Sequence, residues 1–498
     1  MRIISNLFIL LIALVTLSAC NHDESNSVEA TLYHDELAPR IQLTIPQQIA
    51  IYIEHDMQPH LMCKAKICPK KSLATIYQHR EFLPIWLDDD GKAKPDVEQL
   101  IKVLQGSYQD GLNPERYNLK LITALLQQLN SNASGLDMLQ IGAKLDIALT
   151  DAYLSYAREI QNGRVNPVAS YPDWGVSRSL IDTAQQFESS LANNQLIAEL
   201  SRMTPVNPQY LRLKAKLAEY NHKSEGTIGG VSASDLITMK QIILNMDRLR
   251  WLPRNLAESY LWVNIPQFEL DAINNGQVMF NMPVVVGKDG ENKTCSVISN
   301  INMVEINPYW GIPRRIATQE YLAKLKANPL YLANKNIRIY NKNNKEVDPL
   351  SIDWSNVNEN NFQYTFKQDP GNKNALGKVK FNFPNNCGIY LHDTSAKNVF
   401  SRDARSMSHG CIRLGKPLEL ADYILVNREN YSAERISQLI ASDEHSGLKL
   451  KQPLPLYVVY QTLLVNDDGS ITRYKDIYGI DNVAVTVYQP KNDSQITQ

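Results

Sequence analysis

The stretch "SYLWVNIPQFELDAINNGQVMFNMPVVVGK", Ser259–Lys288, decides the fold class, because strand patterns begin here in a chain whose earlier residues read as helices. Its apolar and β-branched runs are interrupted at "NNG", residues 274–276, a sequence typical of a hairpin turn. More strand-like runs follow in "SVISNINMVEINPYW", "KVKFNF" and "CGIYLH". We therefore expect a β-rich domain over residues 246–445, and a C-terminal strand and tail over 446–498 that pack on it.

The residues upstream of this stretch predict a helical domain over 72–245. Apolar residues recur at helical spacing in "DVEQLIKVLQGSYQDGL", "LITALLQQL", "AKLDIALTDAYLSYAREI" and "QYLRLKAKLAEY". Asp110-Gly111 and Asn113-Pro114 supply breaks between helices. The expected fold class is therefore α+β, with a helical domain followed by a β-rich one.

The N-terminus "MRIISNLFILLIALVTLSAC" reads as an export signal over residues 1–20. Its apolar run, Leu7–Val15, is about half as long as a bilayer-spanning helix requires. "LSAC", ending at Cys20, resembles the lipobox of bacterial lipoproteins, which implies a lipid anchor on that cysteine. Asn21 follows it, which favours the outer membrane facing the periplasm. A plain signal peptide with a chance cysteine is the alternative. Residues 21–71 read as a polar tether, with room for one strand or helix in "IQLTIPQQIAIYIE".

Length and charge narrow the class of protein. A chain of 498 residues is too long for one core, so two or three domains are expected. Lys and Arg number 51 against 52 Asp and Glu, a formal net charge of −1, and no phosphate-binding glycine loop is present. We therefore expect no nucleic-acid partner.

A second stretch, "SMSHGCIRL" at Ser406–Leu414, carries the chemistry. In an extended segment, Ile412 and Leu414 point inward while Cys411 and Arg413 share the other face. Gly410 permits a tight backbone that turns its amide and that of Cys411 toward an oxyanion. A cationic neighbour lowers the pKa of a thiol and increases its thiolate fraction. These residues fit a nucleophilic cysteine.

"GIYLHDT", residues 388–394, supplies the matching base. Alternation in a strand places Tyr390 and His392 on one face, opposite Ile389 and Leu391. A histidine within hydrogen-bond reach of a cysteine completes the activation of the thiol. The two stretches together point to acyl transfer.

The residues alone leave other interpretations open. Cys411 is an inert, buried small side chain in one of them. In another, His392, Asp393, His409 and Cys411 bind zinc, although no CxxC, HxxxH or HExxH spacing supports such a site. A papain-like protease lacks its local "CGSCW"-type setting. We expect no metal and no cofactor.

"HDT" at His392–Thr394 followed by "SHGCIRL" at Ser408–Leu414 resembles the signature of L,D-transpeptidases with a YkuD-type catalytic domain, cysteine enzymes that cross-link peptidoglycan. From about Ser72 to Gly479 the chain resembles the long Gram-negative branch of that family, in stretches such as "HREFLPIWLDDDG", "INPYWGIPRRIA" and "DIYG". The resemblance implies 3→3 cross-links between stem peptides, with a tetrapeptide donor and a meso-diaminopimelate acceptor. It also implies acylation by carbapenems. Residues 314–368 read as a structured insertion, which we interpret as a lid.

The resemblance assigns roles to residues of this sequence. Cys411 is the nucleophile that forms a thioester, and His392 is the general base. The backbone at Gly410, helped by Tyr390, holds the oxyanion. The remaining positions shape the substrate site: Arg413, His409, Ser408, Asn307, Trp310 and Arg314.

The sequence departs from the long branch at one place. The small peptidoglycan-binding module usual in the helical domain does not fit in Thr204–Ser234. Substrate binding would then depend on the catalytic domain and the lid. Sequence does not choose the acceptor, so an L,D-carboxypeptidase and a protein-to-peptidoglycan tethering enzyme stay open, with a non-catalytic wall scaffold as a third reading.

The six cysteines allow disulfide bonds in an exported protein. With Cys20 lipidated and Cys411 catalytic, four remain. Cys63 and Cys68 are close enough in sequence to close a small loop. By strand alternation Cys387 shares the face of Ile389 and Leu391, so a Cys295–Cys387 bond would brace the β-core on the face away from Cys411. Two isolated buried thiols are the alternative for that second pair.

Overall fold

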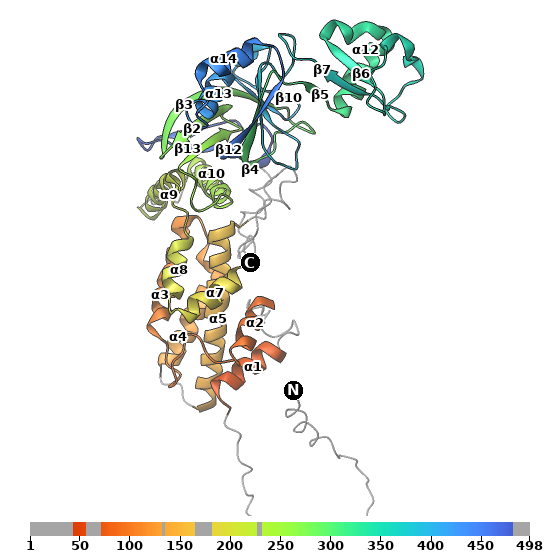
Figure 1. The fold of residues 1–498 in the computed structure, drawn as a ribbon. Helices are drawn as coiled ribbons and strands as arrows, with labels where there is room; N and C mark the ends of the chain where they lie inside the picture. Colours follow the sequence, from red (N-terminus) through yellow and green to blue (C-terminus); the bar gives the residue numbers. More distant parts are fainter. Residues whose placement is uncertain (1–42, 56–70, 132–134, 165–181, 227–231, 482–498) are drawn as a thin grey trace, which may run out of the picture. The chain divides into compact units, whose positions relative to one another are not determined.

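A computed structural model describes residues 43–55, 71–131, 135–164, 182–226 and 232–481 (Figure 1). The chain divides into two compact units, Met1–Leu43 and Thr44–Gln498, and the second contains all the elements below. The proposed lipidation site Cys20 and the proposed Cys63–Cys68 loop lie outside the described residues.

Helices make up the first part of this unit. They are α1 (Ile45–His55), α2 (Lys71–His79), α3 (Pro95–Gly106), η1 (Ser107–Asp110), η2 (Pro114–Tyr117), α4 (Leu119–Asn130), α5 (Gly135–Asn162), α7 (Thr183–Ala192) and α8 (Leu196–Met203). Most of the second half of α5 is buried among them. On α5, the buried carboxylate of Asp146 accepts hydrogen bonds from the Tyr77 hydroxyl at 2.6 Å and the Trp86 amide at 2.7 Å. This pairing fixes α2 and the following loop against α5.

Helix α1 corrects the expected polar tether over residues 21–71. Ile49 and Ile53 lie four positions apart, on one face of the helix, and are buried in the core of the helical part. Residues 45–55 therefore belong to the folded body.

Helices α9 (Pro208–Gly226) and α10 (Ala233–Arg250) connect the helical part to the sheet (Figure 1). They share one apolar core with the strands and the loop that follows them, made by Tyr210, Leu213, Leu217, Ile242, Met246, Leu249, Leu252, Tyr457, Val459, Leu463 and Val465. At the end of α10, the buried Arg250 guanidinium lies 2.7 Å from Asp247 and donates to the Tyr210 hydroxyl at 2.9 Å. Both the core and this ion pair hold α10 between the two parts.

The catalytic part is built on a nine-stranded sheet with the order β10-β3-β11-β9-β8-β4-β12-β1-β2, and β2 also pairs with β3, so the order closes on itself. The strands are β1 (Ser259–Asn264), β2 (Glu269–Asn274), β3 (Gln277–Gly287), β4 (Val297–Ile306), β8 (Val379–Asn382), β9 (Leu391–His392), β10 (Ser406–Ser408), β11 (Ile412–Leu414) and β12 (Ser446–Val459). The predicted hairpin joins β2 to β3, with Asn275 at φ 48° and Gly276 at φ 77°. The expected α+β class is confirmed.

Helices α13 (Pro417–Leu425) and α14 (Ala433–Ala441) follow the last strand of the site. Leu420 and Ile424 of α13, one turn apart, are buried in the core of the sheet, as is Ile436 of α14. A short hairpin, β13 (Leu463–Val465) and β14 (Ile471–Arg473), ends the described elements. No helix within the described residues is both long and apolar enough to cross a membrane.

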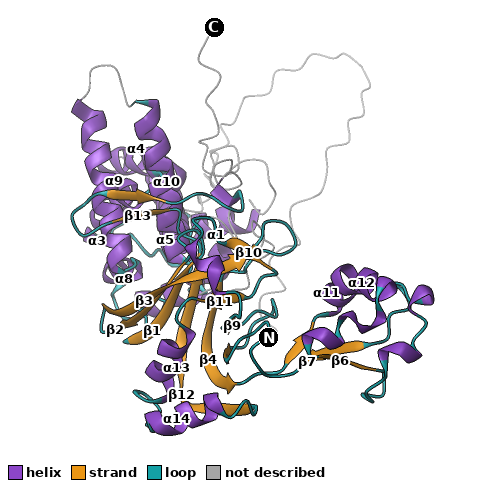
Figure 2. Cartoon of the chain, turned by 90° about the horizontal axis from the view of Figure 1, so that it is seen from above, coloured by secondary structure: helices purple, strands orange, loops and turns teal. Residues whose placement is uncertain are grey.

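The lid is a small module with its own core, here Trp310–Gln368. It contains β5 (Trp310–Ile312), α11 (Arg314–Ile316), a π-helical turn η3 (Ala317–Tyr321), α12 (Leu322–Ala327), η4 (Pro329–Tyr331), η5 (Ala333–Lys335), β6 (Ile337–Tyr340), η6 (Pro349–Ser351), η7 (Trp354–Asn356) and β7 (Thr365–Gln368). Its sheet has the order β5-β7-β6. Figure 2 shows α11 and α12 lying over β6 and β7. Trp354 and Phe366 are buried in a cluster separate from the core of the main sheet.

Candidate active site

A cavity of about 550 Å³ brings together residues from the lid and from the strands that carry the two sequence motifs. Seven of the predicted site residues line it: Cys411, His392, Tyr390, Arg413, His409, Ser408 and Trp310. Asn307 and Arg314 are not among the residues that line this cavity.

Two neighbouring strands bring the motifs together. β9 and β11 run parallel, with Arg413 paired to His392, and the Ile412 amide donates to the Tyr390 carbonyl at 3.0 Å. Ile412 and Leu414 are fully buried, so alternation leaves Cys411 and Arg413 on the cavity side. The strand pairing thus sets the nucleophile motif beside the histidine motif.

His392 is held as a neutral imidazole. Its Nδ1 contacts the carbonyl oxygen of Asp393, which only accepts hydrogen bonds, so Nδ1 carries the proton and Nε2 keeps its lone pair. Burial, with the positive charges of Arg413 and Lys380, lowers the pKa of His392 to about 3. At neutral pH, therefore, Nε2 is available to accept a proton.

Cys411 differs from the expectation that a cationic setting lowers its pKa. Burial raises the pKa of the Cys411 thiol, and this effect outweighs the opposing hydrogen bonds from Tyr390 and the charges of Lys380 and Arg413. Burial thus favours the neutral form of both side chains, the Cys411 thiol and the His392 imidazole.

Tyr390 keeps its proton and is placed to donate it in a hydrogen bond. Burial, reinforced by the neighbouring Cys411, raises the pKa of Tyr390. Its hydroxyl is hydrogen-bonded to Cys411 and to the side chain of Trp310. Lys380 Nζ lies 4.7 Å from the centre of the Tyr390 ring. A protonated phenol at this place can donate to an oxyanion that forms next to the sulfur.

Hydrogen bonds within the turn before Cys411 engage two of the predicted site residues, Gly410 and Ser408. The Gly410 amide donates to Ser408 Oγ at 3.1 Å, and the same hydroxyl donates to the Cys411 carbonyl at 2.6 Å. The amide of Gly410 is therefore already engaged and is not presented to an oxyanion. Ser408 is 2% exposed, so its role is to fix the turn. Gly410 has φ 117°, which explains the glycine at this position.

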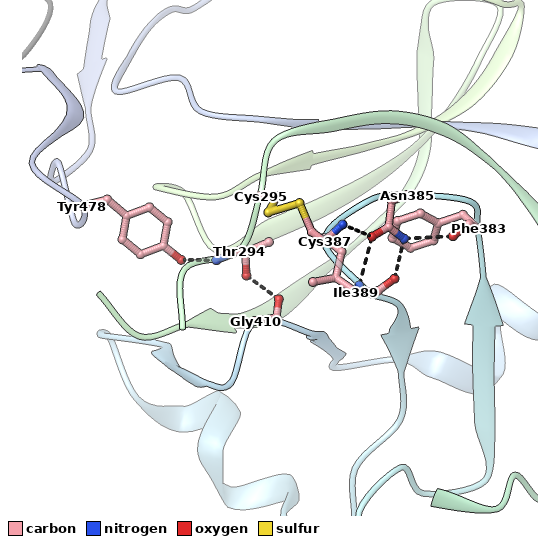
Figure 3. Close-up of a disulfide and its surroundings, with 8 residues drawn as sticks. All are labelled: Thr294, Cys295, Phe383, Asn385, Cys387, Ile389, Gly410 and Tyr478. Atoms are coloured by element: carbon pink, nitrogen blue, oxygen red, sulfur yellow. Dashed lines mark hydrogen bonds between the residues drawn. A yellow bond between two sulfur atoms is a disulfide. The ribbon is translucent and has the colours of Figure 1, made fainter. Parts of the chain in front are cut away.

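A disulfide and a threonine support this turn from outside the cavity motifs (Figure 3). Thr294 Oγ1 donates to the Gly410 carbonyl at 2.7 Å and accepts from the Gly287 amide at 2.8 Å, while the Thr294 amide donates to the Tyr478 hydroxyl at 3.1 Å. The next residue, Cys295, is bonded to Cys387 across a Cα–Cα distance of 6.5 Å. The sequence left open a disulfide bond or two isolated thiols for this pair, and the structure contains the disulfide bond. Among the described cysteines, Cys411 is the free one.

The segment that carries Cys387 is not the strand predicted from sequence. Only Leu391 and His392 form β9. Before them, Asn385 Oδ1 accepts from the amides of Cys387 at 3.1 Å and Ile389 at 3.0 Å, which folds the chain into a turn. Cys387 therefore lines the cavity, where strand alternation had placed it on the opposite face.

Asn307 and Arg314 have structural contacts in place of the predicted substrate contacts. Asn307 is fully buried, and its Nδ2 donates to the Leu439 carbonyl at 2.8 Å. Arg314 donates to the Glu359 carbonyl at 2.7 Å, and its guanidinium lies 5.4 Å from the centre of the Phe362 ring. Asn307 thus anchors the end of α14, and Arg314 stabilises the lid.

Three residues of the site were not predicted from the sequence. Lys380 alternates with Val379 and Phe381 in "KVKFNF", so the pattern of its strand could have placed it on the polar face. Thr294 acts through a contact 116 residues away, and Glu320 through a contact with His409 89 residues away. No local pattern indicates contacts of that span.

Across the described residues, no three His, Cys, Asp or Glu side chains are grouped so that they could hold a metal ion.

Comparison with known proteins agrees with this geometry. Residues 71–217 match a family described as a scaffold domain, and residues 258–431 match the L,D-transpeptidase catalytic domain family, YkuD. A curated Haemophilus influenzae protein named "Putative L,D-transpeptidase" is 28% identical over 472 residues, which cover 94% of this chain and 88% of that protein. The solved Ldtfm-avibactam carbamoyl enzyme matches 62% of this chain and 96% of its own at 10% identity, but the TM-score of 0.20 is too low to carry an argument. Residues 258–431 thus form an L,D-transpeptidase catalytic domain of the YkuD family.

Proposed function

We propose that the protein is a peptidoglycan L,D-transpeptidase that forms 3→3 cross-links between stem peptides through a thioester on Cys411. The observation that carries the proposal is the shared cavity, in which the Cys411 thiol meets the Tyr390 hydroxyl and a neutral His392. Membership of the L,D-transpeptidase family supports peptidoglycan as the substrate class.

In the first half-reaction, Cys411 Sγ attacks the carbonyl that links the third residue of a tetrapeptide stem to its terminal D-Ala. The thiol proton passes to His392 Nε2, and Tyr390 donates a hydrogen bond to the oxyanion. The intermediate collapses when the C–N bond breaks and the imidazolium returns its proton to the departing amine. A thioester and free D-Ala are the products.

In the second half-reaction, the side-chain amine of a meso-diaminopimelate residue on another stem attacks the thioester. The C–N bond forms, the C–S bond breaks, and the thiol is regenerated. Water in place of the amine would give an L,D-carboxypeptidase product, and a protein amine would give a tethered protein. A non-catalytic wall scaffold is the least supported reading, because thiol, base and donor lie together in one cavity.

We also propose that the mature protein is an outer-membrane lipoprotein facing the periplasm, anchored through Cys20, with the catalytic domain over residues 246–445 and the helical scaffold domain before it. The lipobox-like "LSAC" supports the anchor. Attachment at two or more acyl chains would hold the protein stably at a membrane.

The mass of the intact protein after brief exposure to a carbapenem tests the nucleophile. We expect one covalent adduct on the wild-type protein and none on the Cys411→Ala variant. In a digest of peptidoglycan incubated with each protein, 3→3 dimers should appear only with the wild type, because loss of a covalent nucleophile removes nearly all activity. A folded wild-type protein that takes up no carbapenem would contradict the proposed function.

A further inference from the structure

We propose that Glu320 of the lid and His409 of the nucleophile turn form the binding and deprotonation site for the acceptor amine. This inference rests on the proposed function, because it concerns the second half-reaction of the same cavity. Neither residue is used in the activation of Cys411 described above.

The two side chains meet across the cavity. His409 Nε2 lies 2.5 Å from Glu320 Oε1, and both residues line the cavity that contains Cys411. Their side chains are 35% and 42% exposed, so an incoming molecule can reach them. His409 precedes Cys411 by two residues, which keeps the pair next to the thioester.

Charge makes this pair the natural place for an ammonium group. Of the described residues that line the cavity, Glu320 carries the only carboxylate. On the thiol side, Arg413 and Lys380 act on both Cys411 and His392 with positive charge. An alkylamine arrives protonated at neutral pH. It is repelled from the Arg413 side and attracted to Glu320.

The amine must then lose a proton before it can attack. His392 already carries the second proton of this step, the one that reaches the Cys411 thiolate, so the first proton needs a different acceptor. His409 is the imidazole that contacts the cavity's carboxylate, through Nε2 and Glu320 Oε1. With Nε2–H donating to Glu320, Nδ1 of His409 is the atom that accepts the proton.

The step balances as follows. One proton moves from the ammonium to His409 Nδ1, and the neutral amine attacks the thioester carbonyl. As the C–N bond forms and the C–S bond breaks, the nitrogen gives up one further proton, which reaches the Cys411 thiolate through His392. His409 finally releases its proton to solvent.

A simple latch between lid and turn is the competing explanation for the Glu320–His409 contact. The lid has a second attachment, in which Arg315 is hydrogen-bonded to Asn292 and lies 3.5 Å from Glu291. Removal of the Glu320 charge should therefore leave the lid in place. The two explanations differ in which half-reaction they affect.

The test uses the full chain and a purified disaccharide tetrapeptide that serves as both donor and acceptor. The burst of D-Ala released in the first turnover reports the first half-reaction, and the ratio of cross-linked dimer to hydrolysed tripeptide reports how the thioester divides between amine and water. For Glu320→Gln and His409→Asn we expect that ratio to fall at least about tenfold, with D-Ala release changed less than about twofold. The ratio should recover toward alkaline pH, where more of the amine is already neutral.

Glu346→Gln is the matched control, because this lid carboxylate pairs with Arg338 and does not line the active-site cavity. It should leave both readouts unchanged. If D-Ala release and the ratio fall together in Glu320→Gln, the contact is only a latch and the inference is overturned. An unchanged ratio in both variants also overturns it. Absence of D-Ala release by the wild type would instead overturn the proposed function itself.

Discussion

At the scale of single residues, two effects act in opposite directions on the pKa of the Cys411 thiol. Arg413 and Lys380 favour the Cys411 thiolate, while burial favours the thiol, and burial prevails. The same two cations and the same burial keep His392 neutral. Under the proposed mechanism, such a neutral pair reacts when a carbonyl is in place, because the new negative charge then moves to an oxygen that Tyr390 can stabilise.

The pH dependence of Cys411 alkylation by iodoacetamide follows from these shifts. Because the pKa of the thiol is raised, the alkylation rate should climb with pH to a midpoint above that of an ordinary thiol. Lys380→Met should move the midpoint higher still, since the lost cation had lowered the pKa. Peptide mapping identifies the alkylated residue and separates Cys411 from the other cysteines. A rate already maximal at pH 6 would show that a thiolate–imidazolium pair exists at rest.

At the scale of elements, the nucleophile turn is held by contacts from residues distant in sequence. Thr294 bonds to Gly410 on one side and to Gly287 on the other, and the Cys295–Cys387 bond fixes the segment that carries it (Figure 3). Position of the thiol therefore depends on a strand end and a loop that belong to neither sequence motif.

The variant Cys295→Ala/Cys387→Ala tests this dependence. The bond closes a sequence separation of 92 residues, so its loss should lower the free energy of unfolding by roughly 2–5 kcal/mol. Acylation of Cys411 by a carbapenem should also slow at temperatures where the protein is still folded, since Thr294 is no longer fixed.

Thr294→Val separates the two effects. It keeps the disulfide but removes the hydroxyl that bonds to Gly410 and Gly287. We expect slower acylation and a loss of about 1–3 kcal/mol from the polar groups left unpaired. Unaltered acylation in both variants would mean that Ser408 alone positions the turn.

Sequence patterns predicted the parts of this site that depend on neighbouring residues. Alternation located Cys411 and Arg413 opposite Ile412, and "NNG" located the hairpin between β2 and β3. Alternation failed at Cys387, because the Asn385 side chain bonds to the backbone and replaces the strand by a turn.

Local sequence patterns did not predict the contacts between distant segments. The burial that raises the pKa of Cys411 comes from the assembled core and lid, so the cationic neighbours alone predicted the wrong direction. Asn307 and Arg314 were assigned to the substrate because their motif adjoins the lid, yet each bonds to backbone of another segment.

At the scale of the whole molecule, one core joins helices α9 and α10 to the catalytic sheet. The Tyr210 hydroxyl of α9, which donates to Asp110 at 2.9 Å, ties these helices to the helical part. Met246 and Leu249 of α10 and Tyr457 of β12 belong to the same buried cluster. Asn245 strengthens the junction, because its Oδ1 accepts from the Thr462 amide at 2.9 Å. The two parts should therefore unfold together.

Met246→Ala tests this coupling. Met246 is fully buried, so truncation should cost about 2–5 kcal/mol. Far-UV circular dichroism reports chiefly on the helices, and carbapenem acylation reports on the catalytic sheet. We expect both denaturation midpoints to shift by the same amount. A shift in the helical signal alone would indicate independent domains.

The conditions that keep the Cys295–Cys387 bond formed also act on the remaining thiol, Cys411. Such a bond persists only under oxidising conditions, so peroxides and stray disulfides reach the same molecule. Those oxidants react with thiolates far faster than with thiols. Because burial raises the pKa of Cys411, a smaller fraction of it is thiolate than for an ordinary thiol, and its oxidation to sulfenic acid or a mixed disulfide should be slower. The protein thus holds, within one domain, a pair of sulfurs that must be oxidised and a single sulfur that must not.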